Sequence, residues 1–230
     1  MHLLIAITAR AEASGILAQM EAAYGGAQAF LCPEPSMHMP FLANRVPVGP
    51  IAAQGRNRRE ALLEALQLEH DQALVLVAPG GVDTRFAIED WPQGQGIHWL
   101  VSERWQVRHA DAGSLERTGL SFTDLVASCD AVLGKCGYGT VAECAVNGTP
   151  LLYIPRPDWP EEDTLRCWLE AHAAALPVAR HDLETGELRA TVLAAQALEV
   201  RRPAATGAGQ AAEYLLGVCR APHIDDNARP

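Results

Sequence analysis

Short, continuous apolar runs alternate along the chain with stretches in which apolar residues recur every three or four positions. The first pattern is typical of buried strands and the second of amphipathic helices. We predict strands at 3–8, 73–78, 97–101, 106–109, 131–133 and 151–154. We predict helices at 11–24, 58–68, 122–128, 140–147, 161–174 and 207–216. Because the strands are apolar throughout and alternate with helices, the predicted fold class is α/β, with a parallel sheet covered by helices on both faces.

A proline-rich segment separates the first strand and helix from the rest of the chain. Residues 32–50 contain five prolines and little periodicity. Proline fixes φ and donates no hydrogen bond, so we expect an extended connector. One strand and one helix cannot form a core alone and must pack on the larger domain, another chain or another domain. We therefore divide the chain into an N-terminal remnant with its connector (1–47), a main domain (48–220) and a polar tail expected to be flexible (221–230).

The composition, 49% hydrophobic and 20% charged, is that of a globular protein and excludes a largely disordered one. No apolar run approaches the roughly 20 residues that span a bilayer, and the brief apolar start is interpreted as a strand rather than a signal peptide. A net charge of −10 disfavours nucleic-acid binding, although a local phosphate site needs only a few donors. Six scattered cysteines without a C-x-x-C pair argue against disulfides and zinc and favour the cytoplasm.

The segment 129–157, CDAVLGKCGYGTVAECAVNGTPLLYIPRP, carries the most chemical information. It predicts a strand, a glycine-rich turn, a helix, a second turn and a strand. Gly134, Gly137 and Gly139 bracket the first turn, where missing Cβ atoms allow close approach of a ligand or of another backbone. Free N–H groups at the start of the following helix form a natural anion site. Neither a Walker A loop nor G-x-G-x-x-G is present, and tight packing of helix on sheet remains an alternative reason for the glycines.

Two side chains of this segment have competing interpretations. Thr140 and Glu143 fit a capping box, in which each side chain satisfies a backbone N–H at the helix start. Glu143 is equally suited to accept hydrogen bonds from vicinal sugar hydroxyls, since the apolar stripe of the helix lies on another face. Cys136 is either a thiol whose pKa is lowered by the helix N-terminus or, as we favour, a small buried filler.

The run that starts at Asp130, DAVLGKCGYGTVAECAVNGTPLLYIPRP, resembles the C-terminal-domain signature of GT-B nucleotide-sugar glycosyltransferases. That group includes the lipid-linked N-acetylglucosaminyltransferase of peptidoglycan synthesis and the UDP-glycosyltransferases. The runs GKCGYGTVAE and PRPDWPEEDTLRCWLE are most similar to predicted glycosyltransferases that resemble the amino-terminal part of arabinokinase-type sugar kinases. The resemblance extends over about 48–216. It implies a Rossmann-like domain, one half of a GT-B enzyme, that binds a nucleotide sugar.

The resemblance also implies a role for each matching position. The diphosphate would be bound by Gly137, Tyr138, Gly139 and Thr140. Gly80 and Gly81 would let a loop close on the phosphates from the other side. Glu143 would hold the ribose, and the base would meet Leu120, Ser121 and Phe122. For the Ser121 side chain, a helix N-cap is the favoured interpretation.

Donor-sugar contacts would fall to Arg156, Glu162 and Asp163, although the Asp-Gln pair of many relatives is absent here. A surface salt bridge for Arg156 and an acidic first helical turn for Glu162 are the alternatives. Catalytic residues are not assigned. No metal or cofactor is expected, since the nucleoside diphosphate sugar is itself the donor substrate.

GT-B enzymes work in a cleft between two domains, and the N-terminal one supplies the acceptor site and commonly the general base. Only residues 1–44 represent that domain here. The first hypothesis is therefore a donor-binding domain that transfers a sugar to an unknown acceptor when completed by an acceptor domain. That domain would be part of a longer natural chain, a separate subunit or a second copy docked through the N-terminal remnant. The alternative is a non-catalytic nucleotide- or sugar-sensing or protein-interaction module, such as one associated with a sugar kinase. Neither hypothesis involves nucleic acid or a transmembrane segment.

Overall fold

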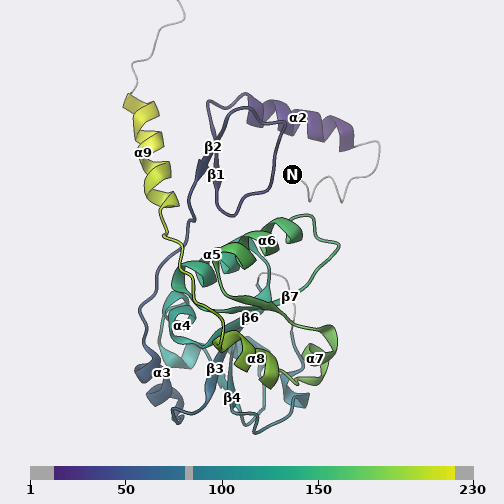
Figure 1. Ribbon diagram of the computed structural model, residues 1–230, viewed down its shortest axis with the longest axis vertical. Helices are drawn as coiled ribbons and strands as arrows, with labels where there is room; N and C mark the ends of the chain where they lie inside the picture. Colours follow the sequence, from purple (N-terminus) through teal and green to yellow (C-terminus); the bar gives the residue numbers. More distant parts are fainter. Residues whose placement is uncertain (1–12, 81–84, 221–230) are drawn as a thin grey trace, which may run out of the picture.

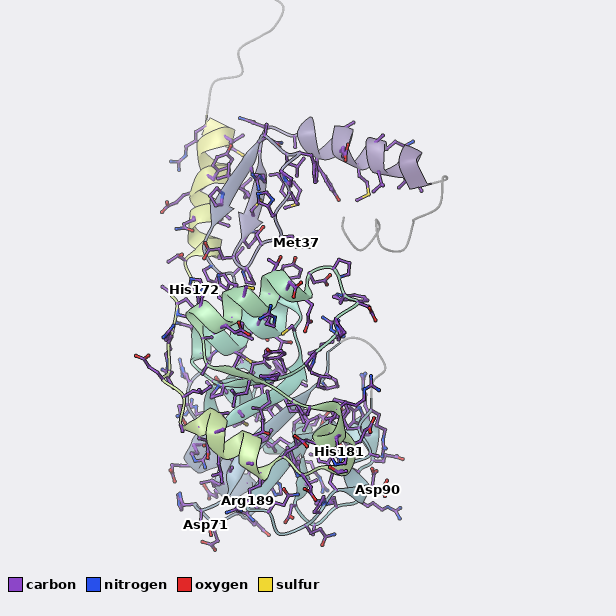
Figure 2. All side chains as sticks on the ribbon, turned by 45° about the vertical axis from the view of Figure 1, so that its right-hand side comes forward. Met37, Asp71, Asp90, His172, His181 and Arg189 are labelled. Carbon is purple, nitrogen blue, oxygen red and sulfur yellow. The ribbon has the colours of Figure 1, made fainter. Side chains whose placement is uncertain are left out.

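The structure is a computed structural model that describes residues 13–80 and 85–220 of the chain. It contains a six-stranded sheet and, apart from it, a two-stranded sheet (Figure 1). Figure 2 places Met37 at the boundary between these two parts, with Asp71 and Arg189 at the far end of the larger one. In the described parts of the chain, no helix has both the length and the apolarity required to cross a bilayer.

All strand pairs of the larger sheet are parallel, in the order β5-β4-β3-β6-β7-β8. The strands are β3 (Ala73–Ala78), β4 (Ile97–Val101), β5 (Ala112–Ser114), β6 (Ala131–Lys135), β7 (Leu151–Ile154) and β8 (Ala175–Pro177). From β3 the chain builds the sheet outward to β5, then returns to β6 and builds in the opposite direction. The order reverses between β3 and β6, as in doubly wound nucleotide-binding folds.

Helices cover both faces of this sheet, which confirms the predicted α/β class. One core layer places alternate strand residues such as Leu74 and Leu76 against four helices: α3 (Arg59–Leu66), α4 (Phe122–Ser128), α5 (Tyr138–Asn147) and α6 (Glu162–His172). The intervening residues, such as Val75 and Val77, pack against α7 (Arg180–Thr185), α8 (Arg189–Gln196) and an aromatic group that includes Trp91. Burial on both faces explains why the strands are apolar throughout.

The smaller sheet pairs β1 (Phe30–Pro33) with β2 (Arg45–Val48) in parallel. The segment 32–50, predicted as an extended connector, is extended at both ends, and there it also pairs into this sheet, which the prediction did not include. Helix α2 (Ala13–Gly25) agrees with the predicted helix at 11–24, and α9 (Gly207–Arg220) lies beside β2 rather than on the large sheet (Figure 1). The strand predicted at 3–8 and the flexible tail at 221–230 lie outside the described residues.

Most other predicted elements agree with the structure, and one strand was misplaced. The predicted strands at 73–78, 97–101 and 151–154 have the bounds of β3, β4 and β7. The strand predicted at 106–109 is wrong, because a 3₁₀ turn, η2 (Glu103–Trp105), precedes it and Gln106 takes a left-handed φ of 49°. The chain pairs with β4 only from Ala112. The sequence prediction also missed β8, α7 and α8.

Candidate functional site

A cavity of about 820 Å³ opens where the order of the large sheet reverses. Its walls are the ends of β3 and β4 with the residues that follow them, and the first turns of α4 and α5. The lining residues are Val77, Ala78, Pro79, Gly80, Arg85, Ser102, Arg104, Trp105, Leu115, Phe122, Gly139, Thr140 and Glu143. Ligands of open α/β sheets bind outside the carboxyl ends of the strands at such a reversal. We call this space the switch-point cavity.

Helix α5 begins in the switch-point cavity with uncapped amides. Its N-cap is Gly137, and no side chain caps the helix. The first intrahelical bond runs from the N–H of Val141 to the carbonyl of Gly137 at 2.9 Å. The amides of Tyr138, Gly139 and Thr140 have no partner within the described part of the chain. They are the unsatisfied donors that make a helix start an anion site.

The predicted capping box of Thr140 and Glu143 is wrong, because α5 starts at Tyr138, two residues earlier than expected. Thr140 therefore lies within the first turn instead of at the N-cap, and Gly137 takes the cap position.

The three glycines of the turn have different roles. A Cβ on Gly134 would lie 2.5 Å from the carbonyl oxygen of Ala78, so this glycine lets β6 approach β3. A Cβ on Gly137 or Gly139 would meet no heavy atom within 4 Å. Gly137 has an ordinary extended φ of −117°, which any residue adopts. Packing therefore explains Gly134 but neither Gly137 nor Gly139, whose missing side chains leave the space outside the amides open.

Glu143 lines the same cavity one turn further along α5. Its carboxylate is partly buried and has no hydrogen-bond partner among the residues that the structure describes. Burial raises the pKa of this carboxyl group above its ordinary value. A carboxylate that no protein donor occupies is available to accept hydrogen bonds from two neighbouring hydroxyls of a ligand.

Two arginines lie in the wall of the switch-point cavity. Arg85 and Arg104 line it, and the guanidinium of Arg85 donates to the carbonyl of Trp105 at 3.1 and 3.2 Å and pairs with Glu89. The sequence prediction missed both arginines, although each follows a buried parallel strand by a few residues, which is a usable signal. These charges offset the net −10 of the chain locally.

The β3 end of the site contains Gly80, which has a φ of +81° and lines the cavity. A Cβ there would lie 2.8 Å from Cε of Lys135, so the glycine makes room for this lysine side chain. Burial, together with the charge of Arg156, lowers the pKa of Lys135. Gly81, predicted to close on the phosphates, lies outside the described residues.

Of the three residues predicted to meet the base, Phe122 alone lines the cavity, with 42% of its surface exposed. Ser121 is the N-cap of α4 and its hydroxyl accepts from the N–H of Asp124 at 3.1 Å, which confirms the favoured structural interpretation of its side chain. Leu120 packs partly against the core.

The residues predicted to hold the donor sugar do not line the cavity. Arg156 donates to the carbonyl of Cys136 in the glycine turn, and its Nη2 lies 3.6 Å from Oε2 of the buried Glu162. Asp163 has a side chain that is 92% exposed and lies 3.5 Å from Arg166. Arg156 and Glu162 thus brace the glycine turn from outside the cavity, and a sugar contact by any of the three remains a prediction.

Cys136 is fully buried behind the turn, and burial raises the pKa of its thiol to about 12. The buried-filler interpretation is confirmed, and the lowered pKa is wrong because desolvation outweighs the helix terminus. In the described ranges no three His, Cys, Asp or Glu side chains gather as a metal site.

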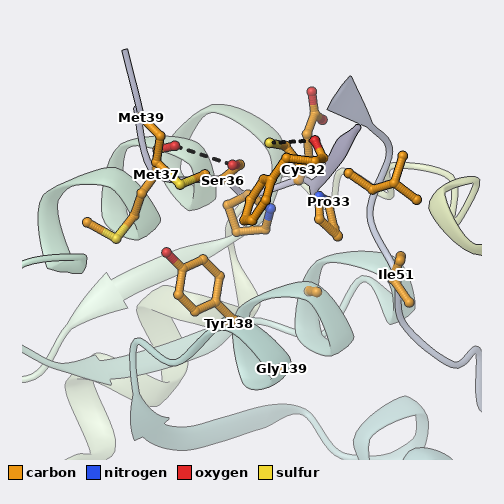
Figure 3. Close-up of a pocket in the computed structure, with 13 residues that line it drawn as sticks. Cys32, Pro33, Ser36, Met37, Met39, Ile51, Tyr138 and Gly139 are labelled. Carbon is orange, nitrogen blue, oxygen red and sulfur yellow. Dashed lines mark hydrogen bonds between the residues drawn. The ribbon is translucent and has the colours of Figure 1, made fainter. Parts of the chain in front are cut away.

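A second cavity, of about 510 Å³, lies on the other side of the first turn of α5, between that helix and the segment 30–39 (Figure 3). Gly139 lines both cavities. In Figure 3 the ring of Tyr138 points away from α5 toward the segment that carries Ser36 and Met37. Tyr138 therefore has its amide at the start of α5 and its ring in the second cavity.

The chain is similar in sequence to a known family and to known proteins. Residues 108–213 match the family model described as "Glycosyltransferase family 28 C-terminal domain". The chain is 24% identical over 179 residues to L-arabinokinase of Arabidopsis thaliana, covering 77% of this chain and 17% of that protein. It is 28% identical over 139 residues to the UDP-N-acetylglucosamine–N-acetylmuramyl-(pentapeptide) pyrophosphoryl-undecaprenol N-acetylglucosamine transferase of Christiangramia forsetii, covering 54% and 38% of the two chains. The matched regions thus span well under half of each relative.

Solved structures are similar in fold. The calicheamicin glycosyltransferase CalG4 superposes with a TM-score of 0.59 at 16% identity, covering 93% of this chain and 61% of that one. The spinosyn forosaminyltransferase superposes with a TM-score of 0.50 at 17% identity, covering 83% and 56%. The Rossmann-like fold predicted from the sequence and the resemblance on which it rested are confirmed.

Proposed function

We propose that this chain, whose residues 108–213 match the glycosyltransferase family 28 C-terminal domain, binds a nucleoside diphosphate sugar in the switch-point cavity and supplies the donor half of a GT-B glycosyltransferase. One observation carries the proposal: the uncapped amides of Tyr138, Gly139 and Thr140 border a cavity that also contains the unpartnered carboxylate of Glu143. Such amides can bind an anion, and such a carboxylate can accept hydrogen bonds from a pair of hydroxyls. A nucleoside diphosphate supplies both, in its pyrophosphate and its ribose.

The amides would stabilise the transition state of sugar transfer. The bond between the anomeric carbon and the diphosphate breaks, and a new bond forms to an acceptor oxygen, whose proton is lost. Negative charge then grows on the leaving diphosphate, where fixed N–H donors and the helix dipole act most strongly. Arg85 and Arg104 line the same cavity and add positive charge to it. We expect no metal to be required, because these groups neutralise the leaving group.

An acceptor-binding partner completes the enzyme in this proposal. The acceptor domain would be part of a longer natural chain, a separate subunit or a second copy of the chain, docked against the part that contains α2, β1 and β2. The two-stranded sheet offers few backbone pairs of its own, and sheets of this size are marginally stable in isolation. Scattered cysteines, all six of them free, favour a cytoplasmic location.

A thermal-shift experiment tests donor binding. UDP, GDP, ADP and dTDP are each added to the chain and to Glu143→Gln, with Glu184→Gln, an exposed site on α7, as the matched control. One nucleotide at about 100 times its dissociation constant should stabilise the chain and the control by about 2.7 kcal/mol and leave Glu143→Gln almost unchanged. A chain that responds to none of the four nucleotides is not a donor-binding domain.

A further inference from the structure

A third cavity, of about 330 Å³, lies at the amino ends of the strands of the large sheet. Its walls are the first residues of β3 and β4, the residue before β6, the start of α3 and one face of α8. The lining residues are Arg59, His70, Asp71, Gln72, Ala73, Gln95, Gly96, Ile97, Asp130, Arg189, Val192, Leu193 and Gln196. Figure 2 shows Asp71 and Arg189 at this end of the molecule, away from Met37. We call this space the amino-end cavity, since the switch-point cavity lies at the opposite ends of β3 and β4.

An ion pair between Arg59 and Asp130 forms one wall of the amino-end cavity. Nη1 of Arg59 donates to Oδ2 of Asp130 at 2.7 Å, and Nη2 donates to the carbonyl of Gln72 at 3.1 Å. The same Oδ2 also accepts from the N–H of Leu74 at 2.7 Å. The other carboxylate oxygen, Oδ1, accepts no hydrogen bond from the described residues and is not enclosed by them. The pair is therefore held in place by the backbone, with one oxygen of Asp130 available as an acceptor.

The side chain of Gln72 offers a second acceptor. Its Oε1 is enclosed at the cavity wall and has no hydrogen-bond partner among the described residues. An enclosed amide oxygen without a donor is unfavourable. Because the terminal torsion of a glutamine side chain is soft, a rotation of the amide group brings this oxygen to a hydroxyl placed in the cavity.

Arg189, at the start of α8, supplies donors. Its Nη1 donates to the carbonyl of Gln95. Gly96 takes a φ of +72°, and a Cβ there would lie 3.0 Å from Nη1, so the glycine makes room for the guanidinium. The N–H groups on Nε and Nη2 have no acceptor among the described residues. Arg189 is thus anchored through one nitrogen and keeps donors on the other two for a ligand.

The charges that line the amino-end cavity balance. Two arginines, Arg59 and Arg189, stand against two aspartates, Asp71 and Asp130. An anion would leave the acceptors of Asp130 and Gln72 without donors, and a cation would leave the N–H groups of Arg189 without acceptors. A neutral molecule with several hydroxyls satisfies both sets, because each hydroxyl both donates and accepts.

Size and apolar lining narrow the class of ligand further. Ile97, Val192 and Leu193 add an apolar strip to the polar groups. The volume of about 330 Å³ is at the small end of the roughly 300–1,000 Å³ that is typical of ligand pockets. A single sugar ring combines these properties, since it carries hydroxyls around its edge and C–H groups on its faces.

We propose that the amino-end cavity is a second ligand site, which binds a neutral monosaccharide. Arg189 donates to the sugar hydroxyls, Asp130 and Gln72 accept from them, and the apolar strip contacts a face of the ring. This site lies at the opposite end of the sheet from the proposed donor site and does not depend on donor binding.

A saturation-transfer NMR titration of the full chain tests the inference. The probes are D-glucose, D-galactose, D-xylose and L-arabinose, and inorganic phosphate and glycine are added as anionic and zwitterionic competitors. We expect at least one of the four sugars to bind. Arg189→Met should weaken its binding at least about tenfold, because hydrogen bonds from a charged donor are lost. Gln72→Leu should weaken it about two- to tenfold, the effect of one neutral hydrogen bond.

The matched control is Arg180→Met on α7, which replaces an arginine whose side chain is 90% exposed and which lies outside the cavity. It should bind the sugar as the unmodified chain does, and circular dichroism should show that all three variants are folded. Absence of binding by all four sugars overturns the inference. Equal binding by Arg189→Met and Arg180→Met also overturns it, as does displacement of the sugar by phosphate or glycine.

Two further measurements separate this site from the donor site. Sugar binding should be unchanged in Glu143→Gln and in the presence of the nucleotide found by thermal shift. Loss of sugar binding in either case would place the sugar in the switch-point cavity, which overturns the second site and leaves the donor proposal standing. A chain that binds the sugar but responds to no nucleotide overturns the donor proposal alone.

Discussion

The side chain of Asn147, in the last turn of α5, accepts a hydrogen bond from the backbone N–H of Gly55 at 2.8 Å. Its amide nitrogen donates to the carbonyl of Ala53 at 3.0 Å. One buried side chain thus fixes the segment that leads from the small sheet to the large one. A Cβ on Gly55 would lie 2.0 Å from the carbonyl oxygen of Thr123, so the segment passes directly against α4. Helix α5, whose first turn borders the candidate site, therefore also anchors the segment that connects the two sheets.

Replacing Asn147 by leucine should destabilise the fold. The substitution leaves the N–H of Gly55 and the carbonyl of Ala53 without their protein partner, and each partly buried hydrogen bond lost should cost about 0.5–1.5 kcal/mol. Urea unfolding followed by circular dichroism measures the loss. Gln196→Leu, an exposed change on α8, is the control and should shift the unfolding free energy little. Equal effects of the two changes would show that the Asn147 contacts contribute nothing.

The glycine turn should separate stability from binding. Gly134→Ala places a Cβ 2.5 Å from a backbone oxygen and should lower the free energy of unfolding by about 1–3 kcal/mol. Gly137→Ala meets no neighbour and keeps an ordinary φ, so its stability should stay within about 1 kcal/mol of the original chain. Its methyl group would enter the space proposed for the diphosphate, and nucleotide binding should weaken. Calorimetric unfolding and nucleotide titration of both variants check this; unchanged binding by Gly137→Ala would count against the phosphate site.

Glu143→Gln should gain stability over the original chain as the pH rises. Burial raises the pKa of this carboxyl in the folded state. The protonated carboxyl therefore contributes stability to the fold below the unfolded pKa of about 4.3, and this contribution is lost as the pH rises through the folded value. Glutamine stays neutral throughout. Melting temperatures of both chains without ligand, from about pH 4 to about pH 7, measure the difference. A constant gap across that range would contradict the pKa shift.

His98 should make the fold sensitive to acid. Both ring nitrogens are buried without partners among the described residues, and burial lowers the pKa of the ring, aided by His109 and opposed by Asp111. A lowered folded pKa means that the stability from the neutral ring is present above the unfolded value of 6.5 and is lost as the pH falls through the folded value. Unfolding free energies at about pH 7.5 and about pH 5 should therefore differ less in His98→Leu than in the original chain. Identical pH dependence of the two would contradict the prediction.

Thiol labelling should divide the cysteines by burial. Cys167 and Cys219 are exposed and should react with Ellman's reagent at once, whereas Cys136 should react only after unfolding. Burial raises the pKa of the Cys136 thiol to about 12, so the reactive thiolate is scarce at neutral pH. Cys136→Ser is the control, since it should leave the fast phase unchanged. A smaller fast phase in that variant would show that Cys136 is accessible.

The amino-acid sequence by itself determined the class of the fold and the place of its glycine turn. Apolar runs at β3, β4 and β7 had the right bounds because strands buried on both faces need apolar side chains at every position. The turn at Gly134–Gly139 was recognisable because three glycines fall between a predicted strand and a predicted helix, although close packing requires a glycine only at Gly134.

Tertiary structure decided which residues share a cavity and which only support it. Arg85, Arg104 and Glu143 come from segments far apart in the chain, and the reversal of strand order between β3 and β6 brings them together. For Arg156 the sequence left a sugar contact and a salt bridge open, and only the fold shows that it pairs with Glu162 and donates to the carbonyl of Cys136 in the glycine turn. The local pattern of hydrophobic and polar residues indicates which positions are buried, because each buried position needs an apolar side chain of its own. Which side chains meet depends on how distant strands are ordered, and no local pattern encodes that order.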